Sequence, residues 1–132
     1  MAPVRVLVVD DQRPFRVAAS AVLRRTPGFE LVGEASSGEE AVERVAALAP
    51  DLVLMDITMP GIGGIAATRA ITAAPVAPVV FFCSTYAEAD LPSDAVDSGA
   101  AAYIGKDELA ADLLARLWRE ASADGAPATP TA

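Results

Sequence analysis

The sequence contains little of what several kinds of functional site require. It has one cysteine and no histidine in 132 residues. This excludes an internal disulfide, a zinc site that needs histidine and a histidine-dependent catalytic triad. Aromatic residues make up only 5% of the chain, although 53% of it is hydrophobic. The core is therefore expected to be aliphatic, with Cys83 as an ordinary member of it.

Long apolar runs and basic residues are also scarce. No run approaches the roughly 18 apolar residues that a membrane span needs. The first residues, Met1 to Pro3, lead straight into a predicted strand, so no signal peptide is expected. Only 10 Lys and Arg stand against 18 Asp and Glu, which gives a net charge of −8. We expect a cytoplasmic protein that makes no contact with membranes or directly with nucleic acid, and whose charge suits a bound divalent cation.

Strand-like and helix-like segments alternate five times, which predicts a single doubly wound α/β domain with a parallel sheet. Strands are predicted at residues 4–9, 29–35, 52–55, 79–83 and 101–104. Helices are predicted at residues 13–25, 37–49, 65–73, a segment disturbed by Pro92, and 108–122. The domain is expected to span residues 3–122. Residues 123–132, rich in Pro, Ala and Thr, are expected to form a disordered tail or the start of a linker.

Acidic residues follow two of the predicted strands at the point where each strand ends. Asp10 and Asp11 follow the first strand, and Asp56 follows the third. Because ligands bind outside the carboxyl ends of strands in such sheets, the three carboxylates are expected to meet there. They would repel one another unless a cation lay among them. The sequence therefore predicts a magnesium site, since this ion prefers oxygen ligands.

Two further polar positions follow the remaining strands. Ser84 and Thr85 end the fourth strand, and Lys106 follows the fifth. A carboxylate can attack a phosphoryl group and form an aspartyl phosphate. Transfer then depends on neutralising three equatorial oxygens, and magnesium, the Lys106 ammonium and the Ser84 hydroxyl would each cover one.

In this order and at these separations, the motifs resemble those of response regulator receiver domains of two-component signalling. The matching segments are Val8-Val9-Asp10-Asp11, Leu54-Met55-Asp56-Ile57 with Met59-Pro60-Gly61, Ser84, and Gly99 through Tyr103 to Lys106. The resemblance implies a flavodoxin-like (βα)5 fold with strand order 2-1-3-4-5. The Lys106-Asp107 pair is similar to that of receivers that precede a helix-turn-helix output domain. The chain is then either a stand-alone receiver or a truncated transcriptional regulator.

The resemblance also implies a magnesium-dependent phosphorylation site. Asp56 would accept a phosphoryl group from a histidine kinase. Asp11 would bind Mg2+ directly and Asp10 through water, and the backbone carbonyl of Thr58 would be a further ligand. Lys106 would pair with the phosphoryl group. The protein would be a signalling switch rather than an enzyme, catalysing only its own phosphorylation and dephosphorylation.

The same resemblance implies the parts of a conformational switch. Ser84 falls at the switch hydroxyl, with Thr85 as a rival. Tyr103 matches the aromatic residue that turns inward on activation, and the face of the fourth helix, fifth strand and fifth helix would then change. Apolar residues on two faces of helix 108–122 predict a homodimer through the face around Trp118. Two departures, Gly63 in the turn after Pro60 and Pro92, predict a looser turn and a disturbed fourth helix.

These residues have other interpretations, of which the last is disfavoured by the sequence. Asp10 and Asp11 could cap the first helix. A pseudo-receiver, which acts only as a protein-binding module, would carry the acids as vestiges. A phosphatase of the aspartyl-nucleophile type would place a second Asp two residues beyond Asp56, where this sequence has Thr58.

Overall fold

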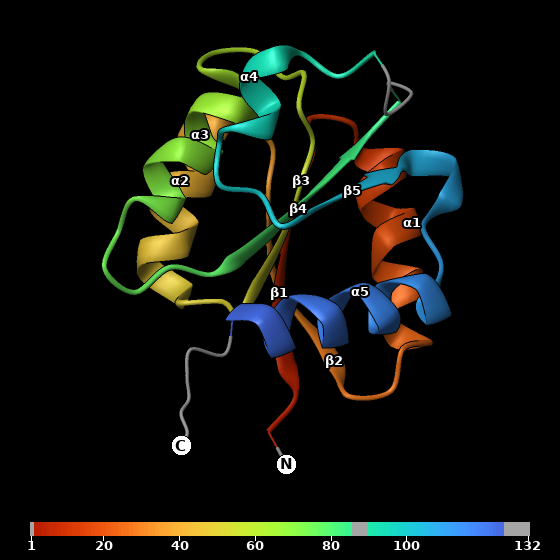
Figure 1. Ribbon diagram of the computed structural model, residues 1–132. Coiled ribbons are helices and arrows are strands. Elements are labelled where there is room, and N and C mark those ends of the chain that lie inside the picture. Colours follow the sequence, from red (N-terminus) through yellow and green to blue (C-terminus); the bar gives the residue numbers. More distant parts are fainter. Residues whose placement is uncertain (1, 86–89, 126–132) are drawn as a thin grey trace.

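Five parallel strands form one sheet in the order β2-β1-β3-β4-β5 (Figure 1), as predicted. A computed structural model describes residues 2–85 and 90–125 of the chain, with side chains described up to residue 122. The strands are β1 (Val4–Val9), β2 (Phe29–Ala35), β3 (Leu52–Met55), β4 (Val79–Ser84) and β5 (Ala102–Gly105). β2 lies at one edge of the sheet, which agrees with its mixture of glutamate and apolar residues.

The helices follow the strands in the predicted alternation. They are α1 (Arg13–Arg24), α2 (Gly38–Leu48), α3 (Gly63–Thr72), α4 (Ser93–Val96) and α5 (Ala111–Gly125). α4 begins immediately after Pro92, which is its N-cap, and has only four residues, so the predicted disturbance at Pro92 is observed. No helix in the described ranges is both long enough and apolar enough to cross a membrane.

Three helix boundaries differ from the prediction by two residues or more. α3 starts two residues early, at Gly63, because the Gly64 N–H bonds to the Ile57 carbonyl and brings the chain into a helical turn at once. α5 starts late, because Lys106–Glu108 form a 3-10 turn and Leu109 after them is extended. The helix continues to Gly125, three residues beyond the predicted boundary, and the rest of the predicted tail lies outside the described residues.

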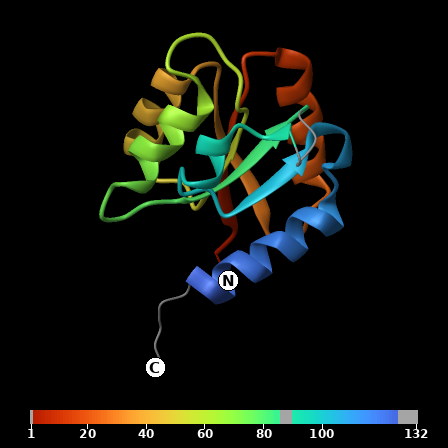
Figure 2. The ribbon, with the colours of Figure 1, turned by 45° about the horizontal axis from the view of Figure 1, so that its top comes forward.

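The helices cover both faces of the sheet, and each face has its own core. α1 and α5 lie on one side and α2, α3 and α4 on the other (Figures 1 and 2). Apolar side chains alternate between the faces along each strand, so Leu7 and Val9 pack on one side and Val6 and Val8 on the other. Cys83 is fully buried in the core, and burial raises the pKa of its thiol to about 12, as expected of a structural cysteine.

Both apolar faces of α5 contact the core under α1 and α5. Leu114 is fully buried, and Leu113, Leu117 and Trp118 pack partly buried against the same cluster. The Trp118 ring meets the Phe29 ring edge-on, with centroids 6.3 Å apart. Part of the Trp118 face is thus used within the chain, and dimerisation through it stays a prediction.

α2 begins with part of a capping box. The Ser37 side chain accepts a hydrogen bond from the Glu40 N–H at 3.1 Å, so Ser37 is the N-cap. In a full capping box the Glu40 carboxylate would return to the Ser37 N–H. Instead it accepts from the Ser36 N–H at 2.8 Å, so both serines are used at this end of the helix.

The residue at the end of α2 has a strained backbone conformation, and a substitution can relieve the strain. Ala49 has φ of 48°, the left-handed region that disfavours side chains with a Cβ. Pro50 follows it and disfavours the right-handed helical conformation there. We therefore expect Ala49→Gly to raise the free energy of unfolding by about 0.5 to 1 kcal/mol, measured by urea denaturation. An unchanged or lower value would show that the added freedom of glycine in the unfolded chain outweighs the relief.

Candidate functional site

The register of the sheet brings the carboxyl ends of β1 and β3 together. Val9 of β1 pairs with Met55 of β3, and the Asp56 N–H bonds to the Val9 carbonyl at 2.9 Å. Asp10 and Asp56 therefore leave the sheet side by side. Each of Asp10, Asp11 and Asp56 offers a carboxylate oxygen, and these oxygens lie within 4.8 Å of one another. Asp10 and Asp56 are buried, whereas Asp11 is exposed.

Lys106 brings a positive charge to this cluster from β5. Ser84 pairs with Gly105 in the β4–β5 register, which places the next residue, Lys106, at the same edge of the sheet. Its Nζ lies 2.6 Å from Oδ2 of Asp10 and 3.7 Å from Oδ2 of Asp56. It also lies 4.8 Å from the centre of the Phe15 ring, a cation–π contact. Lys106 is the only lysine in the sequence.

Burial and charge shift the acid–base properties of the cluster. Burial, and then repulsion by Asp10, raise the pKa of Asp56 to about 6, although Lys106 acts in the opposite direction. Partial burial alone would lower the pKa of Lys106, but its hydrogen bond with Asp10 and the charge of Asp56 outweigh this and raise it. The cluster therefore holds an excess of negative charge that one lysine does not neutralise.

The donor set fits a hard divalent cation. Mg2+ takes oxygen ligands, keeps several waters and is typically bound by one or two carboxylates. Three carboxylates that converge within 4.8 Å, one of them open to solvent, provide that chemistry. A soft ion that prefers thiolate or imidazole would find no ligand here, because the cluster contains carboxylates only.

Comparison with known proteins identifies the family. The response regulator receiver domain family matches residues 6–118. The chain belongs to this family. A protein-glutamate methylesterase/protein-glutamine glutaminase of Alkalilimnicola ehrlichii is 46% identical over 104 residues, 78% of this chain and 27% of that protein. The response regulator UvrY of Escherichia coli strain K12 is 40% identical over 103 residues, 78% of this chain and 47% of UvrY.

Solved receivers agree with the fold. The signal receiver domain of a response regulator NarL from Mycobacterium tuberculosis gives a TM-score of 0.79 at 30% identity, covering 89% of this chain and 98% of that one. A LuxR-family response regulator from Aurantimonas gives a TM-score of 0.81 at 30% identity. The match covers 92% of this chain and 87% of that one. A CheX-CheY-BeF3-Mg complex from Borrelia burgdorferi contains a chain that gives a TM-score of 0.76 at 29% identity. The match covers 91% of this chain and 90% of that one.

Receivers of two-component systems act as phosphorylation switches and bind Mg2+ at an acidic pocket, and in this receiver Asp10, Asp11 and Asp56 form an acidic cluster. The chain spans between about a quarter and a half of the length of the two relatives named above, 27% and 47%. The matched part is the receiver, so the esterase named in the first relative is not carried over.

The receiver does not use its first two aspartates as helix caps. Gln12 is the N-cap of α1 and makes no side-chain cap hydrogen bond. Oδ1 of Asp10 accepts from the Gln12 N–H at 2.8 Å, which closes a turn before the helix. The Asp11 carboxylate accepts no hydrogen bond from the described part of the chain. The capping interpretation is therefore not supported.

The other predicted residues lie at the same edge of the sheet. Ser84 is buried at the end of β4, and its carbonyl accepts a hydrogen bond from the Tyr103 hydroxyl at 3.3 Å. Tyr103 is partly buried on β5, whereas Thr58 and Thr85 are exposed. The roles proposed for the Ser84 hydroxyl, Tyr103 and the Thr58 carbonyl stay predictions.

The turn after Asp56 depends on a close approach of backbone to backbone. Gly63 has φ of 78°, and the next residue, Gly64, lies against the end of β3. A Cβ at Gly64 would stand 1.8 Å from the Asp56 carbonyl oxygen and 3.0 Å from the Ile57 Cα. The turn predicted to be loose because of Gly63 is thus packed tightly at its second glycine.

Two residues of the site were missed from the sequence. Phe15 has no predicted role at the site, yet its ring lies under Lys106. Arg16 received no role, yet its Nη1 donates to the Asp10 carbonyl at 2.7 Å. A signal for Arg16 exists, because it is a cation placed between the apolar residues Phe15 and Val17, one turn after the acidic pair.

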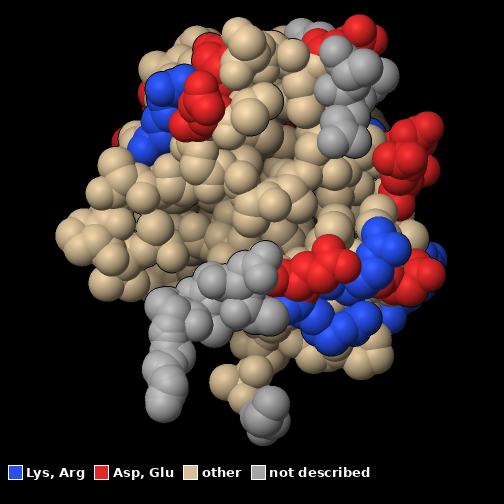
Figure 3. Space-filling view, viewed as in Figure 1, with Lys and Arg blue, Asp and Glu red and all other residues tan. Residues whose placement is uncertain are grey.

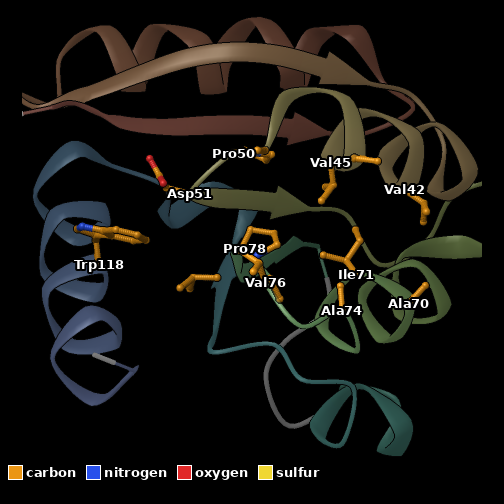
Figure 4. Close-up of a pocket in the computed structure, with 14 residues that line it drawn as sticks. Val42, Val45, Pro50, Asp51, Ala70, Ile71, Ala74, Val76, Pro78 and Trp118 are labelled. Atoms are coloured by element: carbon orange, nitrogen blue, oxygen red, sulfur yellow. The ribbon is translucent and has the colours of Figure 1, made fainter. Parts of the chain in front are cut away.

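A separate cavity of about 530 Å3 lies at the opposite, amino-terminal edge of the sheet. Val42 and Val45 of α2, Ile71 of α3 and Trp118 of α5 surround it, with Asp51 at its rim (Figure 4). None of the predicted site residues lines it. On the face shown in Figure 3, the described acidic and basic side chains are intermixed along α5, without a continuous basic surface.

Proposed function

We propose that this receiver accepts a phosphoryl group on Asp56 from a histidine kinase, with Mg2+ bound by Asp11 directly, Asp10 through water and the Thr58 carbonyl. The observation that carries the proposal is the convergence of three carboxylates within 4.8 Å, with the Lys106 ammonium between Asp10 and Asp56. This combination supplies a nucleophile, ligands for a cation and a nearby positive charge.

The residues divide the work of phosphoryl transfer. With a pKa of about 6, Asp56 is largely ionised at neutral pH, so a carboxylate oxygen is available to attack phosphorus as the phosphorus–nitrogen bond of a phosphohistidine breaks. Bound Mg2+ would neutralise phosphoryl oxygens. Lys106, now paired mainly with Asp10, needs to move only a short way to pair with a phosphoryl group on Asp56.

The switch proposed for the phosphorylated state uses Ser84 and Tyr103. The Ser84 hydroxyl would move to a phosphoryl oxygen. This movement would disturb the hydrogen bond that the Tyr103 hydroxyl donates to the Ser84 carbonyl. A surface pocket of about 180 Å3 beside Tyr103, lined by Phe82, Leu91 and Ala95 among others, is the space into which its ring would turn. The face of α4, β5 and α5 would then change.

The relatives support the proposal without fixing the output. The CheX-CheY-BeF3-Mg complex of Borrelia burgdorferi contains, by its description, Mg and BeF3 with a receiver of this fold. UvrY and the LuxR-family structure favour an output domain after the receiver. We therefore propose residues 3–122 as the receiver, either of a longer transcriptional regulator or acting alone.

Intact mass spectrometry after incubation with acetyl phosphate tests this function. We expect the wild-type protein to gain one phosphoryl group in Mg2+ and none in EDTA, with the label mapped to Asp56 by peptide analysis. In the Asp11→Ala variant, the addition of Mg2+ should have little effect on labelling, because a direct ligand of the ion is lost. Labelling of another residue would contradict the assignment, and no labelling in Mg2+ would favour the pseudo-receiver that binds partners unmodified.

A further inference from the structure

Arg16 of α1 makes two strong hydrogen bonds that the phosphorylation chemistry does not require. Its Nη1 donates to the Asp10 carbonyl at 2.7 Å, and its Nε donates to Oε1 of Glu34 on β2 at 2.9 Å. Its side chain is only 18% exposed. The planar guanidinium thus joins the turn after β1 to the edge strand with two donors fixed relative to each other.

The Asp10 peptide groups are held on both sides. The Asp10 N–H donates to the Ala35 carbonyl at 3.0 Å, while Arg16 holds the carbonyl. The peptide unit between Asp10 and Asp11 is planar, so holding the Asp10 carbonyl also sets the direction of the Asp11 N–H and limits where its Cα lies.

The Asp11 carboxylate depends on this backbone for its position. It is exposed and accepts no hydrogen bond from the described residues, unlike Asp10, which Gln12 and Lys106 hold. If the turn moved, the Asp11 carboxylate would move with it, away from the other two ligands. A ligand that is placed by its backbone alone is sensitive to whatever fixes that backbone.

We propose that Arg16 is a positioning residue of the magnesium site, which fixes the Asp10–Asp11 peptide and thereby places the Asp11 carboxylate for the ion. The inference rests on the proposed magnesium-dependent function. Charge alone predicts the opposite effect. Removing a cation near three carboxylates would strengthen Mg2+ binding, whereas loss of positioning weakens it. The sign of the change in Kd therefore separates the two explanations.

The test is a Mg2+ titration of the metal-free protein, followed by amide chemical shifts. We expect Arg16→Ala to raise the Kd for Mg2+ about tenfold, as loss of an outer-shell partner typically does. The Mg2+ concentration for half-maximal labelling by acetyl phosphate should rise equally, while the labelling rate at saturating Mg2+ should stay within about twofold. Arg16→Lys keeps the charge but lacks the planar guanidinium with its two fixed donors, so it should also weaken Mg2+ binding.

Arg13→Ala is the matched control, because Arg13 is an exposed cation in the first turn of the same helix. It should leave the Kd unchanged or slightly lower. An unchanged or lower Kd in Arg16→Ala, or full recovery in Arg16→Lys, would overturn the positioning role. Failure of the wild-type protein to bind Mg2+ would instead overturn the proposed function itself. Thermal unfolding in EDTA verifies that each variant is folded. If Arg16→Ala does not fold, the Kd of Arg16→Lys for Mg2+ tests the positioning role instead.

Discussion

Asp56→Asn is expected to abolish acyl phosphate formation and, in the same protein, to increase stability in the absence of metal. The first effect follows because an amide does not attack phosphorus, and no other carboxylate shares the position of Asp56 at the end of β3. The second follows because the wild-type carboxylate is buried beside Asp10. An uncharged side chain of the same shape removes that repulsion.

The size and pH dependence of the stabilisation follow from the pKa. A rise in the pKa of Asp56 from 3.8 to about 6 corresponds to at most about 3 kcal/mol of lost stability. Solvent near the exposed Asp11 screens part of this, so we expect Asp56→Asn to gain about 1 to 2 kcal/mol at pH 8. Because the pKa of Asp56 is raised in the folded state, the loss of stability is absent below pH 3.8. It grows between pH 3.8 and about pH 6 and is complete above about pH 6.

Urea denaturation in EDTA at pH 8 and near pH 4 measures this effect. The advantage of the variant should be clear at the higher pH and small at the lower one. Mg2+ should stabilise the wild-type protein and stabilise the variant less, because the variant has lost one carboxylate ligand. An advantage that is the same at both pH values would show that the gain does not come from the charge of Asp56.

Gly64→Ala is expected to have the largest effect on folding. The added Cβ would lie 1.8 Å from the Asp56 carbonyl oxygen, and the atoms it meets belong to the backbone of Asp56 and Ile57. No side chain can rotate away to make room, so either α3 or the end of β3 must shift. We expect the free energy of unfolding to fall by about 3 kcal/mol or more, and the melting temperature by about 10 °C or more.

The neighbouring glycine provides the control. A Cβ at Gly63 would meet only the Ile57 carbonyl oxygen at 3.6 Å, and φ of 78° suits asparagine better than other side chains. Gly63→Asn should therefore change the free energy of unfolding by less than about 1 kcal/mol. Differential scanning calorimetry of both variants compares them directly. Similar small shifts in the two would show that the turn yields easily and that the close approach is not maintained.

The strand ends and the acidic cluster could be predicted because each depends on short-range sequence signals. Asp10, Asp11 and Asp56 each follow an apolar run, and parallel strands present their carboxyl ends at one edge. The boundary of α5 could not be predicted in the same way. The periodic apolar residues continue upstream through Leu109, but the 3-10 turn at Lys106–Glu108 and the extended conformation of Leu109 delay the helix.

The sequence by itself determined the alternation of strands and helices, the identity of the three carboxylates and the family to which the chain belongs. Tertiary structure alone decided which oxygen Lys106 approaches, that Arg16 reaches from α1 to β2, and that Gly64 touches the backbone of Asp56. The physical reason is distance along the chain. Periodicity and turn residues act over a few neighbours, whereas these contacts join segments that meet only when the sheet and its helices have packed.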